Sequence, residues 1–190
     1  MVIDTNLSAE CLRYLCAALP NKKLFVDTVS VAKAVRIKPH LQQIHSLKPN
    51  LAEAQAIADT DYGSTPTDAQ LSTLAHWFTQ QGVRHLYLSL GARGVLYRGP
   101  KQQFLMAIAE PQKAPIIINS NGAGDAMMAA LCAGWIQGLD APDRVAYGLA
   151  CAQIAMSSQT TINPQLSPQL VQRMLKEYPC QMTPLCSPSM

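Results

Sequence analysis

The sequence predicts an α/β fold, with a mostly parallel β-sheet and helices on both faces. Short apolar runs alternate with segments of helical periodicity through the first half of the chain, which is typical of such sheets. Polar residues follow several of these runs, at the carboxyl ends where parallel sheets bind their ligands. With 190 residues and 48% apolar side chains, the chain is long enough to bury one substantial core.

In the first half, each expected strand is followed by a helix signal. Ser8 supplies a side-chain cap for the first helix, after a short apolar strand that ends in polar residues. Pro39 interrupts a stretch of mixed helical spacing, because proline cannot donate the helical hydrogen bond. A short helix is expected after Asn50. These signals predict strands at 1–4 and 24–27 and helices at about 8–19 and 30–44.

The second half continues this alternation and ends in helices. Thr67 or Asp68 caps a helix with one apolar face, which Gly82 closes. We assign residues 1–178 to the folded domain, and we expect the proline-containing tail 179–190 to be loose. The remaining expected strands are 86–90, 95–98, 103–108 and 116–118, and the remaining helices are 124–137, 142–157 and 167–176.

Composition argues against several classes of protein. The net charge is only +3 and the basic residues are scattered, so nucleic acid is not an expected partner. The apolar stretch from Ala126 to Ile136 is shorter than the roughly 18 residues that a membrane span needs. The six cysteines include no C-x-x-C pair and the four histidines have no metal-binding spacing. We therefore expect reduced thiols in a cytoplasmic protein, and neither a membrane protein nor a metalloenzyme of a familiar type.

The most informative stretch is the polar, glycine-rich turn Asn119–Asp125, which opens a long Ala/Met-rich helix. Gly122 and Gly124 let the backbone approach an anion, and the following helix directs its unpaired N–H groups to the same place. Asp125 lies in the first helical turn, where it can take a proton from a hydroxyl while the amides hold a phosphoryl group. Alone, the turn fits equally well with plain helix punctuation. No P-loop or Rossmann spacing is present, so phosphate chemistry would need another scaffold.

Two further motifs carry candidate residues, and each has two interpretations. Asn50 and Glu53 have the spacing of a helix capping box, but they can also face phosphates and, through water, a divalent cation. The segment Ser89–Gly94 fits a hairpin turn, and its glycines would also let a nucleotide lie against the backbone. Arg93 is left out of the candidate site, because an arginine in a turn is more often solvated.

Taken in order, these motifs resemble the carboxyl-terminal part of the PfkB/ribokinase family of carbohydrate kinases. The resemblance covers Val2 to about Leu175. It implies a ribokinase-like fold and an ATP-dependent kinase that phosphorylates the 5′-hydroxyl of a sugar or nucleoside, most specifically pseudouridine. The segments that carry it are Phe25-Val26-Asp27-x-Val29-Ser30-x-x-Lys33, Ile44-His45-x-Leu47-Lys48-Pro49-Asn50, Ser89-Leu90-Gly91-x-x-Gly94 and Gly122-Ala123-Gly124-Asp125.

The resemblance also implies a role for each candidate residue. Asp125 would be the catalytic base, and Glu53 would organise magnesium through water. A potassium ion would lie near Asn119, where Asn121 replaces the threonine that is usual in the family. The anion hole would be Gly122, Ala123 and Gly124; the ATP-binding residues would be Asn50, Ser89, Gly91 and Gly94, with 148–157 flanking the adenine; and the sugar-side residues would be Asp4, Asn6 and Asp27.

Family members begin with a longer amino-terminal segment that carries a Gly-Gly sugar motif and a β-lid, and this sequence contains neither. Because a lid excludes water and completes the site, we expect a truncated form with reduced catalysis. The expected partners are the nucleotide, the sugar or nucleoside and, in a full-length form, a second copy of the chain. The alternatives are a catalytically inactive remnant that binds nucleotide and another sugar kinase of the same family.

Overall fold

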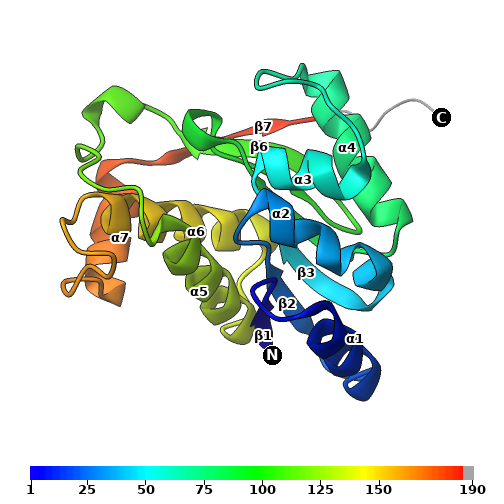
Figure 1. Ribbon diagram of the computed structural model, residues 1–190. Coiled ribbons are helices and arrows are strands. Elements are labelled where there is room, and N and C mark those ends of the chain that lie inside the picture. Colours follow the sequence, from blue (N-terminus) through cyan, green and yellow to red (C-terminus); the bar gives the residue numbers. More distant parts are fainter. Residues whose placement is uncertain (186–190) are drawn as a thin grey trace. The chain divides into compact units, whose positions relative to one another are not determined.

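The computed structural model describes residues 1–185 of the chain (Figure 1). Seven strands are hydrogen-bonded in the order β1-β2-β3-β4-β5-β6-β7, which confirms the α/β class. The strands are β1 Val2–Asp4, β2 Leu24–Asp27, β3 Ile44–Lys48, β4 His85–Ser89, β5 Val95–Arg98, β6 Gln103–Ile108 and β7 Cys180–Pro184. The α-helices are α1 Ala9–Ala18, α2 Val31–Ala34, α3 Leu51–Ala58, α4 Asp68–Gln80, α5 Ala123–Ile136, α6 Ala141–Met156 and α7 Pro168–Glu177, and the 3₁₀ helices are η1 Val35–Gln43, η2 Gly91–Arg93 and η3 Pro111–Lys113.

The first four strands are parallel neighbours. Ile3 on β1 is the register partner of Val26 on β2, Val26 pairs with Leu47 on β3, and Leu47 pairs with Leu86 on β4. Helical segments connect these strands, because parallel neighbours need a crossover connection. The carboxyl ends of β1 to β4 therefore lie at the same edge of the sheet, and so do the polar residues that end these strands.

The chain divides into two compact units. Within the described residues, the first unit consists of residues 1–90, 96–105 and 184–185. The second unit consists of residues 91–95 and 106–183.

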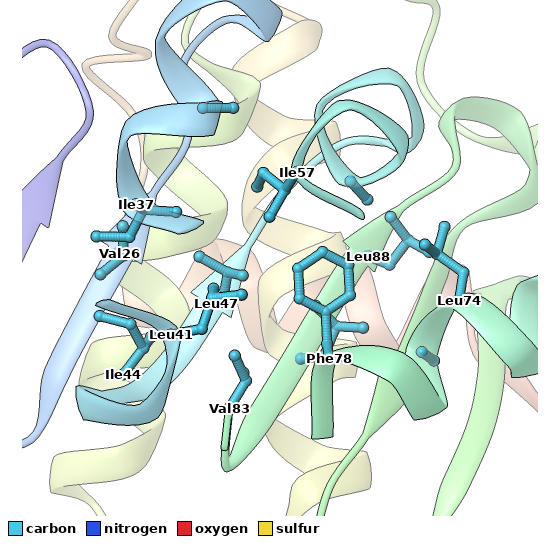
Figure 2. Packing of buried hydrophobic residues seen from close by; sticks show 14 of the residues in the cluster. Val26, Ile37, Leu41, Ile44, Leu47, Ile57, Leu74, Phe78, Val83 and Leu88 are labelled. Atoms are coloured by element: carbon cyan, nitrogen blue, oxygen red, sulfur yellow. The ribbon is translucent and has the colours of Figure 1, made fainter. Parts of the chain in front are cut away.

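The core of the first unit lies between the parallel strands and the helices that cover them. Figure 2 shows side chains from β2, β3 and β4 pointing toward side chains of η1, α3 and α4. Each of these core residues is at most 2% exposed, so removal of apolar surface from water is the main force that holds the helices on the sheet. They are Val26, Ile37, Leu41, Ile44, Leu47, Ile57, Leu74, Phe78, Val83 and Leu88.

The second unit is built around α5 and α6. A small residue lets these helices approach, since a Cβ added at Gly148 on α6 would lie 3.3 Å from Cγ of Met127 on α5. A second cluster joins α5 and α6 to α7, so this unit has its own small core. Its members are Ala130, Ala150, Cys151, Ile154, Val171 and Met174.

Most of the expected elements are confirmed, but β3 was not predicted. Three of its five residues are polar, so its composition predicts a connecting segment before the motif at Asn50 rather than a buried strand. Every residue of β3 is nevertheless buried, and several of its polar groups have partners: Nδ1 of His45 lies 2.9 Å from Oγ of Ser46, and Lys48 forms an ion pair with Asp27.

Two expectations are wrong. The apolar run Ile116–Ile118 is not a strand, and its side chains are exposed. The backbone N–H groups of Ile118 and Asn119 donate instead to the carbonyl of Met156 at the end of α6. The tail is not loose over Cys180–Pro184, which forms β7; proline is acceptable in a strand at the end of a sheet. Residues 186–190 lie outside the described part of the chain.

Candidate active site

The start of α3 is fixed by a reciprocal cap. Oδ1 of Asn50 accepts a hydrogen bond from the backbone N–H of Glu53 at 2.9 Å, and Oε2 of Glu53 accepts one from the backbone N–H of Asn50 at 2.9 Å. The capping-box interpretation of this motif is thus confirmed. It does not compete with a role in binding, because Asn50 is exposed at the edge of the sheet.

Glu53 is unusually buried for a carboxylate, with 4% of its surface exposed. Besides the cap, its Oε2 accepts a hydrogen bond of 2.6 Å from the hydroxyl of Thr28, which directly follows β2. Among residues 1–185, no hydrogen bond reaches the other carboxylate oxygen, Oε1. Within the described residues, the protein therefore holds one carboxylate oxygen of Glu53 and not the other.

The carboxyl ends of β1 and β2 carry the three residues expected on the sugar side. Asp4 and Asp27 are register partners, so their Cα atoms lie opposite each other on adjacent strands. Asp4 accepts a 2.8 Å hydrogen bond from the backbone of Asn6, and Oδ1 of Asn6 accepts one of 2.6 Å from Nζ of Lys33. Asp27 forms a buried ion pair of 2.9 Å with Lys48. The structure brings these polar groups together, and it gives Asp27 a structural partner that the sequence motif alone does not indicate.

Ser89 ends β4 beside the cap of α3. An isolated parallel bridge joins Asn50 to Ser89, and the backbone N–H of Ser89 donates to the carbonyl of Pro49 at 2.9 Å. Its hydroxyl donates to the same carbonyl at 3.3 Å. Asn50, Glu53 and Ser89 therefore form one group at the edge of the sheet where the carboxyl ends of β3 and β4 lie.

The turn formed by η2 and the following Gly94 has two glycines with positive φ, of which packing requires only one. Gly94 has φ of 84°, and a Cβ there would lie 2.1 Å from the carbonyl oxygen of Met106. Gly91 has φ of 59° but open space around the position of a Cβ, with nothing within 4 Å. Gly94 is thus explained by packing, whereas no neighbouring atom explains Gly91, which lies exposed.

The turn before α5 leaves the helix amino terminus open. Gly122 is the N-cap residue with φ of 81°, and it has no side chain to accept the first N–H groups. A Cβ at this position would lie 2.1 Å from the carbonyl oxygen of Thr161. The first intrahelical bond runs from the N–H of Ala126 to the carbonyl of Gly122, so the amides of residues 123–125 precede the helical hydrogen-bond pattern. These amides and the positive end of the dipole of a 14-residue helix form a site suited to an anion.

Two polar residues flank this amino terminus. Asp125 lies in the first turn of α5 with its side chain exposed. Oδ1 of Asn119 accepts a hydrogen bond of 3.0 Å from the backbone N–H of Asn121, and its amide nitrogen donates to the carbonyl of Gln159 at 3.5 Å. Asn119 therefore shapes the turn that ends at Gly122. An exposed carboxylate beside open amides is an arrangement that can remove a proton while the amides hold a phosphoryl group.

Comparison with known proteins defines the family. The family model described as pfkB family carbohydrate kinase matches residues 2–168. This chain belongs to the pfkB family. It is 36% identical over 170 residues to pseudouridine kinase from Escherichia coli (strain K12), which corresponds to 88% of this chain and 51% of that protein. The chain spans about half the length of the curated relatives it matches.

Solved structures of a carbohydrate kinase and a ribokinase confirm the ribokinase-like fold. A carbohydrate kinase from Agrobacterium tumefaciens superposes with a TM-score of 0.76 at 25% identity, over 96% of this chain and 56% of that one. The Arabidopsis thaliana ribokinase complexed with ribose and ATP gives a TM-score of 0.77 at 18% identity, over 92% of this chain and 55% of that one. At this level of identity the second likeness supports the fold alone.

The possible metal ligands of this pfkB chain suit a magnesium ion that is bound mainly by a nucleotide and by water. Among residues 1–185, no three His, Cys, Asp or Glu side chains are grouped so that they could hold a metal ion. Glu53 offers a single carboxylate, and Mg²⁺ often keeps several waters and is bound by one or two carboxylates plus substrate phosphates. The residues present therefore fit an ion that arrives with a nucleotide, rather than a dedicated metal cage. In the same described part of the chain, no helix is both long and apolar enough to cross a membrane.

Sequence reasoning missed Thr28 and the pairing of Lys48. Thr28 had one signal, a polar residue directly after a buried strand, but its partner Glu53 is 25 positions away. Lys48 was part of a recognised motif without an assigned role, and its partner Asp27 is identified only by the register of β2 and β3.

Proposed function

We propose that this chain carries the ATP-binding and catalytic-base part of a pfkB kinase, and that the acceptor is the 5′-hydroxyl of pseudouridine. The observation that carries the proposal is the amino terminus of α5, where Asp125 stands in the first turn beside amides that have no side-chain cap. Membership of the pfkB family, whose members use ATP to phosphorylate alcohol groups, supports the reaction class.

In the proposed reaction, the carboxylate of Asp125 accepts the proton of the acceptor hydroxyl. The oxygen then forms a bond to the γ-phosphorus of ATP as the bond from that phosphorus to the β,γ-bridging oxygen breaks, which yields a phosphate ester and ADP. The backbone amides of Ala123 and Gly124 donate hydrogen bonds to the oxygens of the transferring group, where negative charge accumulates. Asp125 afterwards releases its proton to water.

The nucleotide side of the proposed site is the group formed by Asn50, Glu53 and Ser89. Magnesium, when bound with ATP, would neutralise phosphate charge, and Glu53 would hold its water shell through Oε1. The exposed backbone at Gly91 is proposed to lie along the nucleotide. Potassium near Asn119 and the sugar-side roles of Asp4, Asn6 and Asp27 belong to the same proposal.

The choice of pseudouridine rests on the 36% identity to the Escherichia coli pseudouridine kinase. Other pfkB sugars are the alternative within the same reaction class. The purified chain should be incubated with γ-labelled ATP, Mg²⁺ and, in turn, pseudouridine, uridine, ribose and fructose 1-phosphate. We expect label transfer to be fastest with pseudouridine.

A calorimetric titration with ATP and Mg²⁺ separates the remaining possibilities. Binding together with phosphoryl transfer supports the kinase proposal. Transfer to ribose but not to pseudouridine would contradict the proposed substrate and would still support the proposed reaction class. Binding without transfer to any acceptor would indicate a nucleotide-binding remnant. The absence of both would refute the proposed function for this chain.

A further inference from the structure

The hydroxyl of Thr28 makes a contact that the proposed reaction does not use. Thr28 is fully buried, at 0% exposed, and its Oγ1 donates to Oε2 of Glu53 at 2.6 Å. A hydrogen bond of this length from a hydroxyl to a carboxylate falls in the range of charge-assisted bonds, which are roughly twice as strong as neutral ones. Thr28 thus connects the carboxyl end of β2 directly to α3.

The contact reaches the same carboxylate oxygen of Glu53 that the helix cap already holds. The backbone N–H of Asn50 donates to the same Oε2, at 2.9 Å, so both donors hold one oxygen. Two donors at one oxygen restrict rotation of the carboxylate plane, which the cap alone would leave freer. Oε1, which no hydrogen bond reaches among residues 1–185, is thereby kept in one direction.

Two hydrogen bonds also hold the backbone carbonyl of Thr28. Its carbonyl accepts a hydrogen bond of 2.7 Å from the hydroxyl of Thr5 after β1, and one of 2.5 Å from the backbone N–H of Ser30. The latter bond closes a tight turn over Val29, whose φ of 38° is rare for a β-branched residue. Strain of this kind persists where the surroundings overdetermine a conformation, often at functional sites.

We propose that Thr28 is a positioning residue that aims Oε1 of Glu53 at the water shell of magnesium-bound ATP. The proposal rests on the proposed function, because it assigns Thr28 a task only if Glu53 meets the nucleotide. Groups that orient a metal-facing ligand typically change metal affinity by about 10-fold to 100-fold when they are removed. Thr28 therefore contributes to the magnesium dependence of binding and not to ATP binding as such.

The test compares Thr28→Val, which keeps the shape and removes the hydroxyl, with Thr28→Ser, which keeps the hydroxyl. Ser72→Ala is the matched control, because it removes another buried hydroxyl of the first unit, one that accepts a 2.8 Å bond from Gln103. The dissociation constant of ATP is measured by calorimetry with Mg²⁺ and with EDTA. We expect the increase in ATP affinity that Mg²⁺ produces to be about 10-fold smaller in Thr28→Val than in the wild type. Thr28→Ser and Ser72→Ala should retain the full increase. An equal gain in Thr28→Val and the wild type would overturn the proposal.

A ligand-free readout separates failure of this proposal from failure of the proposed function. The ¹³C resonance of the Glu53 side-chain carboxyl group is recorded without nucleotide in the wild type, Thr28→Val and Thr28→Ser. We expect it to shift in Thr28→Val only. If the wild type binds no ATP, the proposed function fails and the assignment of Thr28 to magnesium fails with it, whereas the carboxyl shift still shows whether Thr28 holds Glu53. An unshifted resonance in Thr28→Val contradicts the positioning role whether or not ATP binds.

Discussion

Asp27 on β2 and Lys48 on β3 form an ion pair of 2.9 Å between register partners of adjacent parallel strands, with side chains only 12% and 7% exposed. Removal of the Asp27 carboxylate would leave the Lys48 ammonium group buried without this partner, which is costly because a buried charge needs a compensating one. The pair therefore fixes the carboxyl ends of β2 and β3, from which Thr28 and Asn50 extend.

We expect Asp27→Asn to destabilise the chain by about 3–5 kcal/mol, the usual result of breaking a buried pair. The double variant Asp27→Asn/Lys48→Met should recover much of this loss, because it removes the orphaned charge as well. Urea unfolding followed by circular dichroism measures both. The control is Arg173→Ala, which breaks an exposed pair with Glu177 and should cost less than about 1 kcal/mol. A cost for Asp27→Asn no larger than that of the control would show that the buried pair is not structural.

Gly94 and Gly91 allow a comparison within one turn. Both have positive φ, but only at Gly94 would a Cβ collide with backbone, at 2.1 Å from the carbonyl oxygen of Met106. We expect Gly91→Ala to cost about 1–2 kcal/mol, the price of a left-handed conformation. Gly94→Ala should cost several times as much or prevent folding. Thermal unfolding measures the difference, and equal costs would mean that the collision is relieved by movement of the turn.

Val29 offers a substitution that is expected to stabilise the chain. Its φ of 38° carries a cost of about 1–3 kcal/mol for a non-glycine residue, whereas glycine adopts such angles readily. Val29 is 40% exposed, so Val29→Gly loses little packing. We expect a gain of about 1 kcal/mol after the entropic cost of glycine is subtracted. Val31→Gly, at a similarly exposed position in α2, should instead destabilise, and a loss at both positions would argue against strain at Val29.

Cys151 links stability to alkaline pH. Burial raises the pKa of its thiol from 9.0 to about 11. Between these values the unfolded chain gives up the thiol proton while the folded chain keeps it, so the free energy of unfolding should fall as pH rises from about 9 to 11. Cys151→Ala should make this fall shallower, as measured by urea unfolding at several pH values. Cys11→Ala serves as the control, and the same slope in both variants would refute the contribution of Cys151.

The elements that can be predicted from the sequence are those whose structure depends on residues a few positions apart in the chain. Ser8, for example, caps α1 through a bond to the backbone of Cys11, three positions away. Strand β3 was missed because its polar residues become acceptable in a core only through partners such as Asp27, 21 positions earlier in the sequence. The run Ile116–Ile118 has strand composition, but its backbone is paired by Met156 at the end of α6. In the candidate site, Asn50 and Glu53 were found from local spacing, and Thr28 was not, because its role depends on a contact across two elements.

The decisive prediction concerns Asp125. Asp125→Asn keeps the size of the side chain and its place in the first turn of α5, but an amide cannot accept the proton of the acceptor hydroxyl. We expect kcat for pseudouridine phosphorylation to fall by at least about 10²–10⁴, with the dissociation constant of ATP changed less than about twofold, since uniform binding is retained. The control is Asp143→Asn, an exposed aspartate in the first turn of α6, which should leave both quantities unchanged. Similar losses of kcat in the two variants would point to a general effect of charge at helix termini and would remove Asp125 from the role of base.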